Sequence, residues 1–187
     1  GGQSNEINTN SPHSVIGGGI RNVVRANARY ATIPGGTEAA AVNYGQQAYA
    51  SGAFTPLASG EAQSSLHVLR GVTTNQVPQE LFLDGEGERL KLAPRSAVNF
   101  DIQVVATIED ILAANAYYIR GLIKRTAAGT TSLVGTPEIT VLAEEAPAWD
   151  VIVEADDASD ALRIKVTGTV GKVVRWVTTV RSTEVVF

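Results

Sequence analysis

Two clusters of carboxylates come nearest, among the residues of this 187-residue chain, to a catalytic or metal-binding pattern. Glu144 and Glu145 are adjacent, and Asp156 and Asp157 are followed by Asp160. A pair of carboxylates can hydrolyse a glycosidic bond, and oxygen ligands of this kind also bind calcium. The Asp-Asp-x-x-Asp spacing lacks the glycine of a calcium loop. Solvated loop charge is therefore the preferred interpretation, followed by a cation site and then hydrolysis, and no metal-ligating residue is predicted.

The histidines offer no catalytic arrangement either. The chain has only His13 and His67, in different segments. A hydrolase triad needs a histidine between a nucleophile and an orienting carboxylate, and the Gly-x-Ser-x-Gly motif is absent. We expect both histidines to be structural, with an ion on a symmetry axis at His13 as the alternative. The prediction is a protein that is not an enzyme, with no catalytic residue and no cofactor.

Aromatic residues indicate where a sugar could bind. Trp149 follows an acidic stretch at the expected boundary between a loop and a strand, so it could present its indole as a platform. Tyr117 and Tyr118 point to opposite faces of one expected strand, so one should be core and the other exposed. Trp176 lies within an expected strand and is predicted to be core. The candidate ligand-binding residues are Trp149, Tyr118, Glu144 and Glu145.

Charge and composition exclude several classes of partner. The formal net charge is -4, and no lysine- or arginine-rich run is present, which argues against nucleic acid and against anionic membranes. No apolar run approaches the roughly 20 residues that cross a bilayer, so no membrane insertion is expected. Cysteine is absent, so packing and hydrogen bonds must hold the fold. Methionine is also absent, and we expect the chain to be a piece of a longer protein.

Composition divides the chain near residue 65, and the first segment repeats. Residues 1–65 are glycine-rich, whereas residues 66–187 carry the net negative charge. Gly1-Gly2 recurs as Gly18-Gly19 and again as Gly35-Gly36. A fixed short period with glycine at the corner predicts one small coil of β-structure for each repeat.

The energetics of such coils favour an oligomer. Ordering one repeat costs roughly 25 kcal/mol at about 1.5 kcal/mol per residue. Each buried apolar side chain returns only about 1.5–3 kcal/mol, and each repeat has few of them. The missing burial is expected to come from other chains.

The second segment reads as successive strands. Apolar and polar residues alternate over residues 100–106, 117–123, 162–166 and 173–179, which is the period of a half-buried strand. Turn-forming residues separate them. About eight strands at this spacing predict a sandwich or jelly roll. Residues 108–115 read as a short helix or as a connection between strands.

The repeat resembles a known family. The pattern Gly-Gly-x-x-Asn-x-(Ile/Val), the run Tyr-Ala-Thr-Ile-Pro-Gly-Gly at 30–36 and Tyr-Ala-Ser-Gly at 49–52 are similar to the head repeats of trimeric autotransporter adhesins. The same repeats occur in bacteriophage tail fibres. The resemblance implies three chains wound into a β-roll or interlocked prism. Residues 37–39 depart from the pattern, so an irregular coil is expected there.

The second segment also resembles a C-terminal β-domain of phage tail fibres. The similar stretches are residues 69–71, 81–85, 89–92 and 149–151. This resemblance implies no catalytic motif. The fold prediction is all-β, with a short trimeric β-roll or β-prism at 1–65 followed by a jelly-roll-like β-sandwich at 66–187.

The resemblance implies a function in the virion. It favours the receptor-binding region of a tail fibre, which attaches to host surface polysaccharide or lipopolysaccharide as a homotrimer. The alternatives are a bacterial trimeric adhesin, or a fibre-trimerisation module without a ligand of its own. A polysaccharide depolymerase with a carboxylate site between subunits is the third interpretation.

Overall fold

The computed structural model describes residues 1–187, with every side chain except that of Asp110. β-strands and the loops between them make up the described chain, together with one short 3-10 turn, η1 (Glu109–Ile111). No α-helix occurs in these residues. The predicted all-β class is therefore confirmed. Residues 108–115, left open between a helix and a connection, contain η1 and join two long strands.

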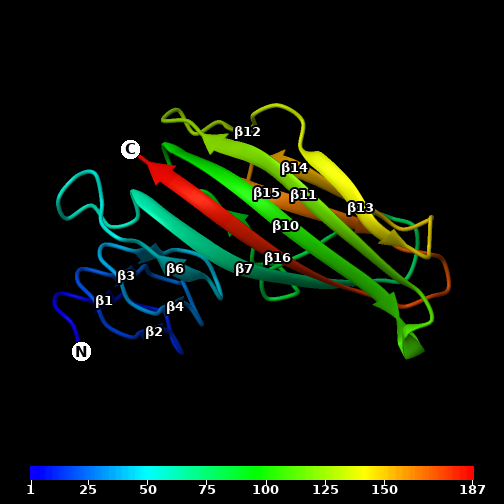
Figure 1. The fold of residues 1–187 in the computed structure, drawn as a ribbon, viewed down its shortest axis with the longest axis horizontal. Helices are drawn as coiled ribbons and strands as arrows, with labels where there is room; N and C mark the ends of the chain where they lie inside the picture. Colours follow the sequence, from blue (N-terminus) through cyan, green and yellow to red (C-terminus); the bar gives the residue numbers. More distant parts are fainter.

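Residues 1–61, which we call the coil segment, form a stack of short parallel strands (Figure 1). One side of the stack comprises β1 (Glu6–Ile7), β3 (Val23–Val24) and β5 (Ala40–Ala41). Another side comprises β2 (Val15–Ile16), β4 (Thr32–Ile33) and β6 (Gln47–Tyr49). Single bridges from Gln3 through Ile20 and Thr37 to Ser51 make a third side.

The stack follows the repeat seen in the sequence. Glu6 pairs with Val23, and Val23 pairs with Ala40. Each coil, which we call a rung, therefore places equivalent residues one above another. The last rung is shorter, because Thr32 pairs with Gln47. The irregularity expected at residues 37–39 is not found there, because Thr37 pairs with Ile20 and Ala40 with Val23 in the regular register, and the shortening comes only after them.

Asparagine and glycine join one rung to the next. Asn22 is fully buried, and its Nδ2 donates to the carbonyls of Gly18 and Gly36 at 3.0 Å each. Its Oδ1 accepts from the backbone N–H of Ala39 at 3.0 Å. Gly19 has a φ of +86°, and a Cβ there would lie 2.0 Å from the carbonyl oxygen of Gly36. Glycine is required at this corner by conformation and by space.

The coil segment has a narrow core. Its buried cluster is mainly alanine, completed by one valine and one isoleucine: Val24, Ala28, Ala31, Ile33, Ala39, Ala41, Ala48 and Ala50. Small side chains let the walls of the rungs approach closely, but they remove little apolar area from water.

One sheet runs from the coil segment through the rest of the molecule. Strand β6 pairs antiparallel with β7 (Ala62–Thr73). From there the order continues through β16 (Val174–Val186), β10 (Ser96–Ile108), β11 (Ala114–Arg125) and β12 (Thr131–Leu133), while β13 (Glu138–Glu144) also pairs with β11. We call this the long sheet. The predicted division at residue 65 falls inside β7.

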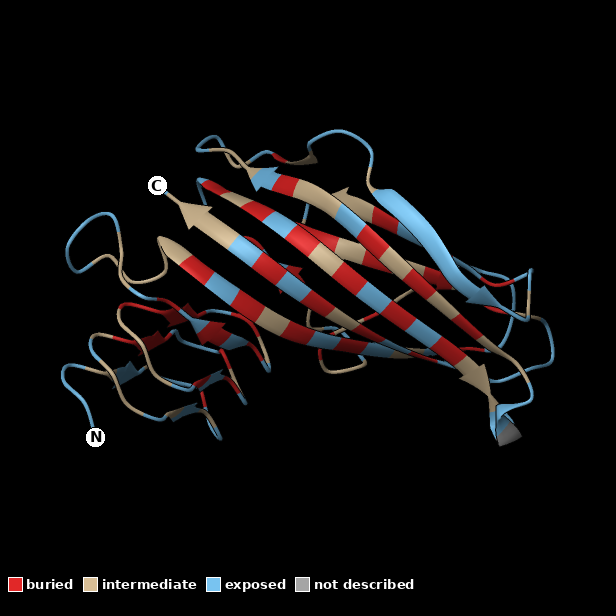
Figure 2. Ribbon diagram, viewed as in Figure 1, coloured by how far each residue is buried: buried red, intermediate tan, exposed pale blue. Residues whose placement is uncertain are grey.

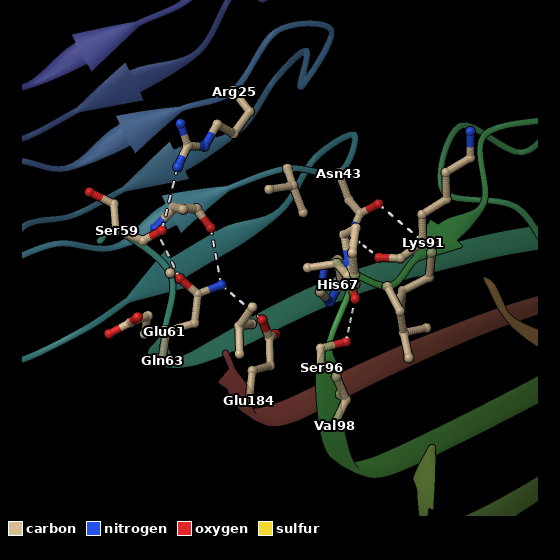
Figure 3. Close-up of a pocket in the computed structure, with 18 residues that line it drawn as sticks. Arg25, Asn43, Ser59, Glu61, Gln63, His67, Lys91, Ser96, Val98 and Glu184 are labelled. Carbon is tan, nitrogen blue, oxygen red and sulfur yellow. Dashed lines mark hydrogen bonds between the residues drawn. The ribbon is translucent and has the colours of Figure 1, made fainter. Parts of the chain in front are cut away.

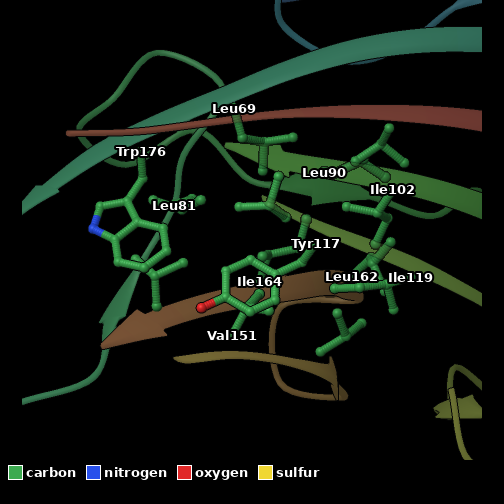
Figure 4. Close-up of a cluster of buried hydrophobic side chains, with 14 of the residues drawn as sticks. Leu69, Leu81, Leu90, Ile102, Tyr117, Ile119, Val151, Leu162, Ile164 and Trp176 are labelled. Carbon is green, nitrogen blue, oxygen red and sulfur yellow. The ribbon is translucent and has the colours of Figure 1, made fainter. Parts of the chain in front are cut away.

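A second sheet covers the inner face of the long sheet. It consists of β14 (Asp150–Asp156), β15 (Ala161–Thr167), β8 (Gln79–Glu80) and β9 (Leu90–Lys91). We call residues 62–187 the two-sheet part. Its core includes Leu69, Ile102, Ile164 and Trp176, contributed by both sheets (Figure 4).

Burial alternates along the long strands, as the sequence period predicted (Figure 2). Phe100 is fully buried and lies across from Gly121, where a Cβ would meet the phenyl ring at 2.5 Å. Trp176 is fully buried, so its assignment to the core is confirmed. Tyr117 is also buried while Tyr118 is partly exposed, as their opposite faces required.

Candidate functional site

A stack of aromatic side chains lies along one corner of the coil segment. The rings of His13 and Tyr30 stack with centroids 5.0 Å apart and planes inclined by 15°. The ring of Tyr44 follows at 5.2 Å from Tyr30, inclined by 57°. Tyr30 is 49% exposed, so its ring is available at the surface. We call His13, Tyr30 and Tyr44 the aromatic stack.

The local backbone holds the stack in place. His13 and Tyr30 have φ values of 62° and 59°, which non-glycine residues adopt only at constrained corners. The guanidinium of Arg29 lies 5.6 Å from the centre of the Tyr44 ring. The same guanidinium pairs with Glu88 of the two-sheet part at 2.7 Å. Arg29 therefore fixes the stack against the neighbouring part of the molecule.

The sequence carries a signal for two members of this site. His13 and Tyr30 occupy equivalent positions of successive repeats. Tyr44 falls out of register, because the last rung is shorter. An aromatic residue repeated at one corner of a stacked coil must lie beside its equivalent in the next rung. That rule finds the first two members, and the shortened rung hides the third.

Trp149 does not present a platform. Its side chain is only 4% exposed, and its ring packs against that of Trp176 with centroids 5.9 Å apart. Its Nε1 donates to Thr169 Oγ1 at 3.1 Å. The prediction that the Trp149 indole is exposed is therefore wrong. Trp149 lies at a loop-to-strand boundary, as expected, but this boundary folds inward against the core.

Tyr118 lies on the outer face of the long sheet. Its hydroxyl donates to Asp101 Oδ1 at 2.5 Å, and this hydrogen bond to the carboxylate raises the pKa of the tyrosine. The guanidinium of Arg120 lies 5.6 Å from the ring centre. Tyr118 is thus accessible, but its hydroxyl already has a partner.

The two glutamates lie away from Tyr118. Glu144 pairs with Asn115, whose side chain points inward, while Tyr118 points outward. Glu145 Oε2 accepts from the backbone N–H of Ala114 at 2.9 Å. The structure therefore does not bring the four predicted ligand-binding residues together into one site.

The aspartates of the second cluster pair with neighbouring side chains and backbone. Arg163 Nη1 donates to Asp156 Oδ2 at 3.0 Å, which lowers the pKa of that carboxyl. Asp160 pairs with Arg125 at 2.6 Å, and Asp157 accepts from the N–H of Thr131 at 2.5 Å. Across the residues that the structure describes, no group of three or more acidic, histidine or cysteine side chains could hold a metal ion. The same residues include no helix long and apolar enough to span a membrane.

No protein-family model matches the chain, and no curated protein matches it. Among solved structures, it is similar to tailspike protein gp49 of Acinetobacter baumannii bacteriophage Fri1, a capsular polysaccharide depolymerase, with 9% identity and a TM-score of 0.40 over 97% of this chain and 36% of that chain. It is also similar to the tailspike of Acinetobacter baumannii phage AM24, with 9% identity and a TM-score of 0.32 over 91% of this chain and 39% of that chain. A third is the tailspike of Acinetobacter phage vB_ApiP_P1, with 12% identity and a TM-score of 0.26 over 99% and 38%.

All three similar structures are phage tailspikes, and this chain spans well under half the length of each. One of them is a depolymerase, which overturns the expectation that the protein is not an enzyme. That expectation rested on the lack of a recognisable motif, and a pair of carboxylates contributed by different chains has no motif in one sequence. Enzymatic activity therefore belongs among the functions to be measured.

Proposed function

We propose that this chain is the host-attachment region of a phage tail fibre or tailspike. In this proposal it acts as a homotrimer, with the coil segment as a β-roll stalk and the two-sheet part as a sandwich-like tip. Its ligand is a polysaccharide or lipopolysaccharide of the bacterial surface, and its location is the virion tail. Three features of the molecule support the proposal.

The observation that carries it is the inverted distribution of apolar side chains in the coil segment. Alanines fill the inside, while larger apolar side chains lie outside. Exposed by more than a third, and facing outward, are Val15, Ile20, Tyr49, Phe54 and Leu57. Large apolar side chains exposed in this number, around a core of alanine, favour contact with another chain. Burying each side chain against another chain would return about 1.5–3 kcal/mol, which is the burial that the alanine core lacks.

The outer face of the long sheet adds a second unpartnered surface. Val105 and Val177 are cross-strand neighbours, and they are 51% and 44% exposed. With Ala116 and Leu142 they line a shallow groove across β16, β10, β11 and β13. A second copy of the chain would cover this face. The exposed residues of β6 belong to the same sheet.

The aromatic stack supports a polysaccharide ligand. An exposed tyrosine ring offers a large apolar face together with a polar hydroxyl, which suits the C–H face and the hydroxyls of a sugar ring. A trimer carries three copies of the stack. Linked weak sites raise the effective concentration of ligand, so a repeating polymer could be held firmly by contacts that are individually weak.

The first test is the mass of the chain in solution, measured by light scattering at several dilutions. We expect a stable mass of three chains. Tyr49→Ser, which replaces an outward apolar side chain of β6, should shift the equilibrium toward monomer on dilution. Val170→Ser is the matched control, because Val170 is 69% exposed in a distant loop and should leave the mass unchanged. A monomer at every concentration would overturn the trimeric proposal.

The second test is binding to purified bacterial surface polysaccharides on an array, with Tyr30→Ala as the variant. Losing the aromatic face should weaken binding by about tenfold. Tyr118→Phe is the control. It changes a tyrosine of the two-sheet part, away from the aromatic stack, and should bind normally. The chain length of any bound polysaccharide is followed by gel filtration, because shortening would identify a depolymerase. Absence of binding to every polysaccharide of a susceptible host would contradict the proposal.

A further inference from the structure

A cavity of about 430 Å³ lies where the coil segment meets the two-sheet part (Figure 3). One wall comes from the last rung, through Ala40 and Val42. The opposite wall comes from β7, β9, β10 and β16 of the two-sheet part. The volume falls within the roughly 300–1,000 Å³ of small-molecule sites. We call this cavity the junction pocket.

His67 is the unusual residue of the junction pocket. It is 2% exposed, and neither of its ring nitrogens has a hydrogen-bond partner. Burial lowers its pKa to about 4, so the ring is neutral at neutral pH, although the charge of Glu184 acts in the opposite direction. A neutral imidazole has one donor and one acceptor. Leaving both unpaired is costly, and such groups in native proteins call for an explanation.

The other buried polar groups around the pocket already have partners. Gln63 Oε1 accepts from the N–H of Ala40 at 2.9 Å, and its Nε2 donates to Glu184 Oε2 at 2.8 Å. Asn43 exchanges two hydrogen bonds with the backbone of Lys91, at 3.1 and 3.0 Å. These bonds join the coil segment to the two-sheet part and hold the pocket walls in place. His67 is left as the buried lining side chain whose polar atoms have no partner.

The lining defines the chemistry of that ligand. Leu90, Leu92 and Val98 give the pocket apolar walls. The charges of Glu61 and Glu184 are balanced by those of Arg25 and Lys91, which favours a neutral ligand, and the described residues offer no cluster of metal ligands. A hydroxyl group can both donate and accept, so a sugar hydroxyl can pair with either the donor or the acceptor nitrogen of a neutral imidazole. The ring carbons would then pack on the apolar walls.

We propose that the junction pocket binds one neutral sugar residue, whose hydroxyls hydrogen-bond to the imidazole of His67. The source of that residue, a branch or end of the surface polysaccharide, rests on the proposed function. The pocket is separate from the aromatic stack, so a branched polymer could engage both. Arg25, whose Nη2 donates to the carbonyl of Ser59 at 3.5 Å, and Lys91 also line the pocket.

The test is an NMR titration of the ring nitrogens of His67 in the unaltered chain. The probes are glucose, galactose and N-acetylglucosamine, with glucuronic acid as the charged comparison. We expect at least one neutral sugar to shift the His67 signals saturably in the millimolar range, while the indole N–H signal of the fully buried Trp176 stays fixed. No shift with any neutral sugar, or a larger shift with glucuronic acid, would overturn the proposal.

Two variants sharpen the result. His67→Gln keeps one donor and one acceptor and should retain binding, followed by the signals of neighbouring Leu90 and Val98. His67→Phe has neither, and its dissociation constant should rise by at least about tenfold. Equal binding by both variants would contradict the role of the imidazole. If His67→Phe does not fold, the titration of the unaltered chain still decides.

This experiment also separates the pocket from the proposed function. Sugar binding at His67 without binding of any surface polysaccharide would keep the pocket and reject the attachment role. If the chain binds polysaccharide while its His67 signals never move, the attachment role is kept and the sugar site in the junction pocket is rejected.

Discussion

The coil segment and the two-sheet part are both all-β, yet different interactions hold them. In the two-sheet part, large side chains from facing sheets make the core, among them the fully buried Phe100, Ile164 and Trp176. In the coil segment the core is mainly alanine, and backbone groups, Asn22 and close-packed glycines join the rungs. The difference teaches that side-chain volume decides stability in one part, while backbone geometry decides it in the other.

The largest expected effect is in the two-sheet part. Trp176→Ala would leave a cavity and remove the hydrogen bond from Nε1 to Thr73 Oγ1, which is 2.9 Å long. We expect a loss of about 4 kcal/mol in the free energy of unfolding, measured by urea denaturation followed by circular dichroism. Val177→Ala, on the exposed face of the same strand, should cost less than about 0.5 kcal/mol in monomeric protein. Similar losses for both would break the distinction between inner and outer face.

In the coil segment, adding a single methyl group should be severe. Gly19→Ala introduces a side chain at a φ of +86° and 2.0 Å from a carbonyl oxygen. Conformation costs about 1–2 kcal/mol, and overpacking against backbone adds a similar amount, so we expect a loss of about 3 kcal/mol. The same substitution at Gly45, with a φ of +63° and nothing within 4 Å, tests conformation alone and should cost about half as much. Hydrogen exchange of the coil amides separates local opening from global unfolding.

His67 should make stability depend on pH at the boundary between the two parts. Burial lowers its pKa from 6.5 to about 4. As the pH falls through this window, the unfolded chain binds a proton that the folded chain does not, so stability falls and then levels off below about pH 4. The full loss is about 3 kcal/mol at roughly 1.36 kcal/mol per pH unit. His67→Gln should remove this part of the slope between pH 7 and 4.5, measured by urea denaturation at each pH.

Asn22→Ala tests the side-chain bonds between rungs. It would leave the buried N–H of Ala39 and the carbonyl of Gly18 without their partner, while the carbonyl of Gly36 keeps the N–H of Ile20. We expect a loss of about 2 kcal/mol, seen as faster hydrogen exchange confined to residues of the coil segment. Asn5→Ala removes the equivalent side chain of the end rung, which is partly exposed, and should cost less. Equal exchange in both variants would show that the buried ladder adds nothing.

The sequence was sufficient for the periodic features. Alternation of apolar residues predicted the long strands, and the glycine spacing predicted the stacked rungs, because both depend on local periods. The pairing of β6 with β7, which joins the two parts in one sheet, has no local signal. It depends on where the shortened last rung ends, and a shift of a few residues would change which edge of the stack faces β7.

The candidate sites were less accessible from sequence. Trp149 looked exposed because charged and small residues precede it, but its burial follows from the turn into β14 and contact with Trp176. His67 stands in an alternating strand like any inward residue. Its isolation from hydrogen-bond partners arises only when the last rung, β9 and β16 close around it. Residues this distant in the chain leave no shared pattern.

The continuity of the long sheet also has a mechanical meaning. A pull on the N-terminal end of the coil segment reaches the two-sheet part through β6 and β7, which share a short pairing from Gln47–Leu66 to Tyr49–Ser64. Beyond it, β7 pairs with β16 along its whole length. Under load the rungs should therefore open one after another before the two-sheet part yields. Each released repeat would lengthen the chain by about 60 Å, so the coil segment would act as an extensible tether that protects the two-sheet part from force.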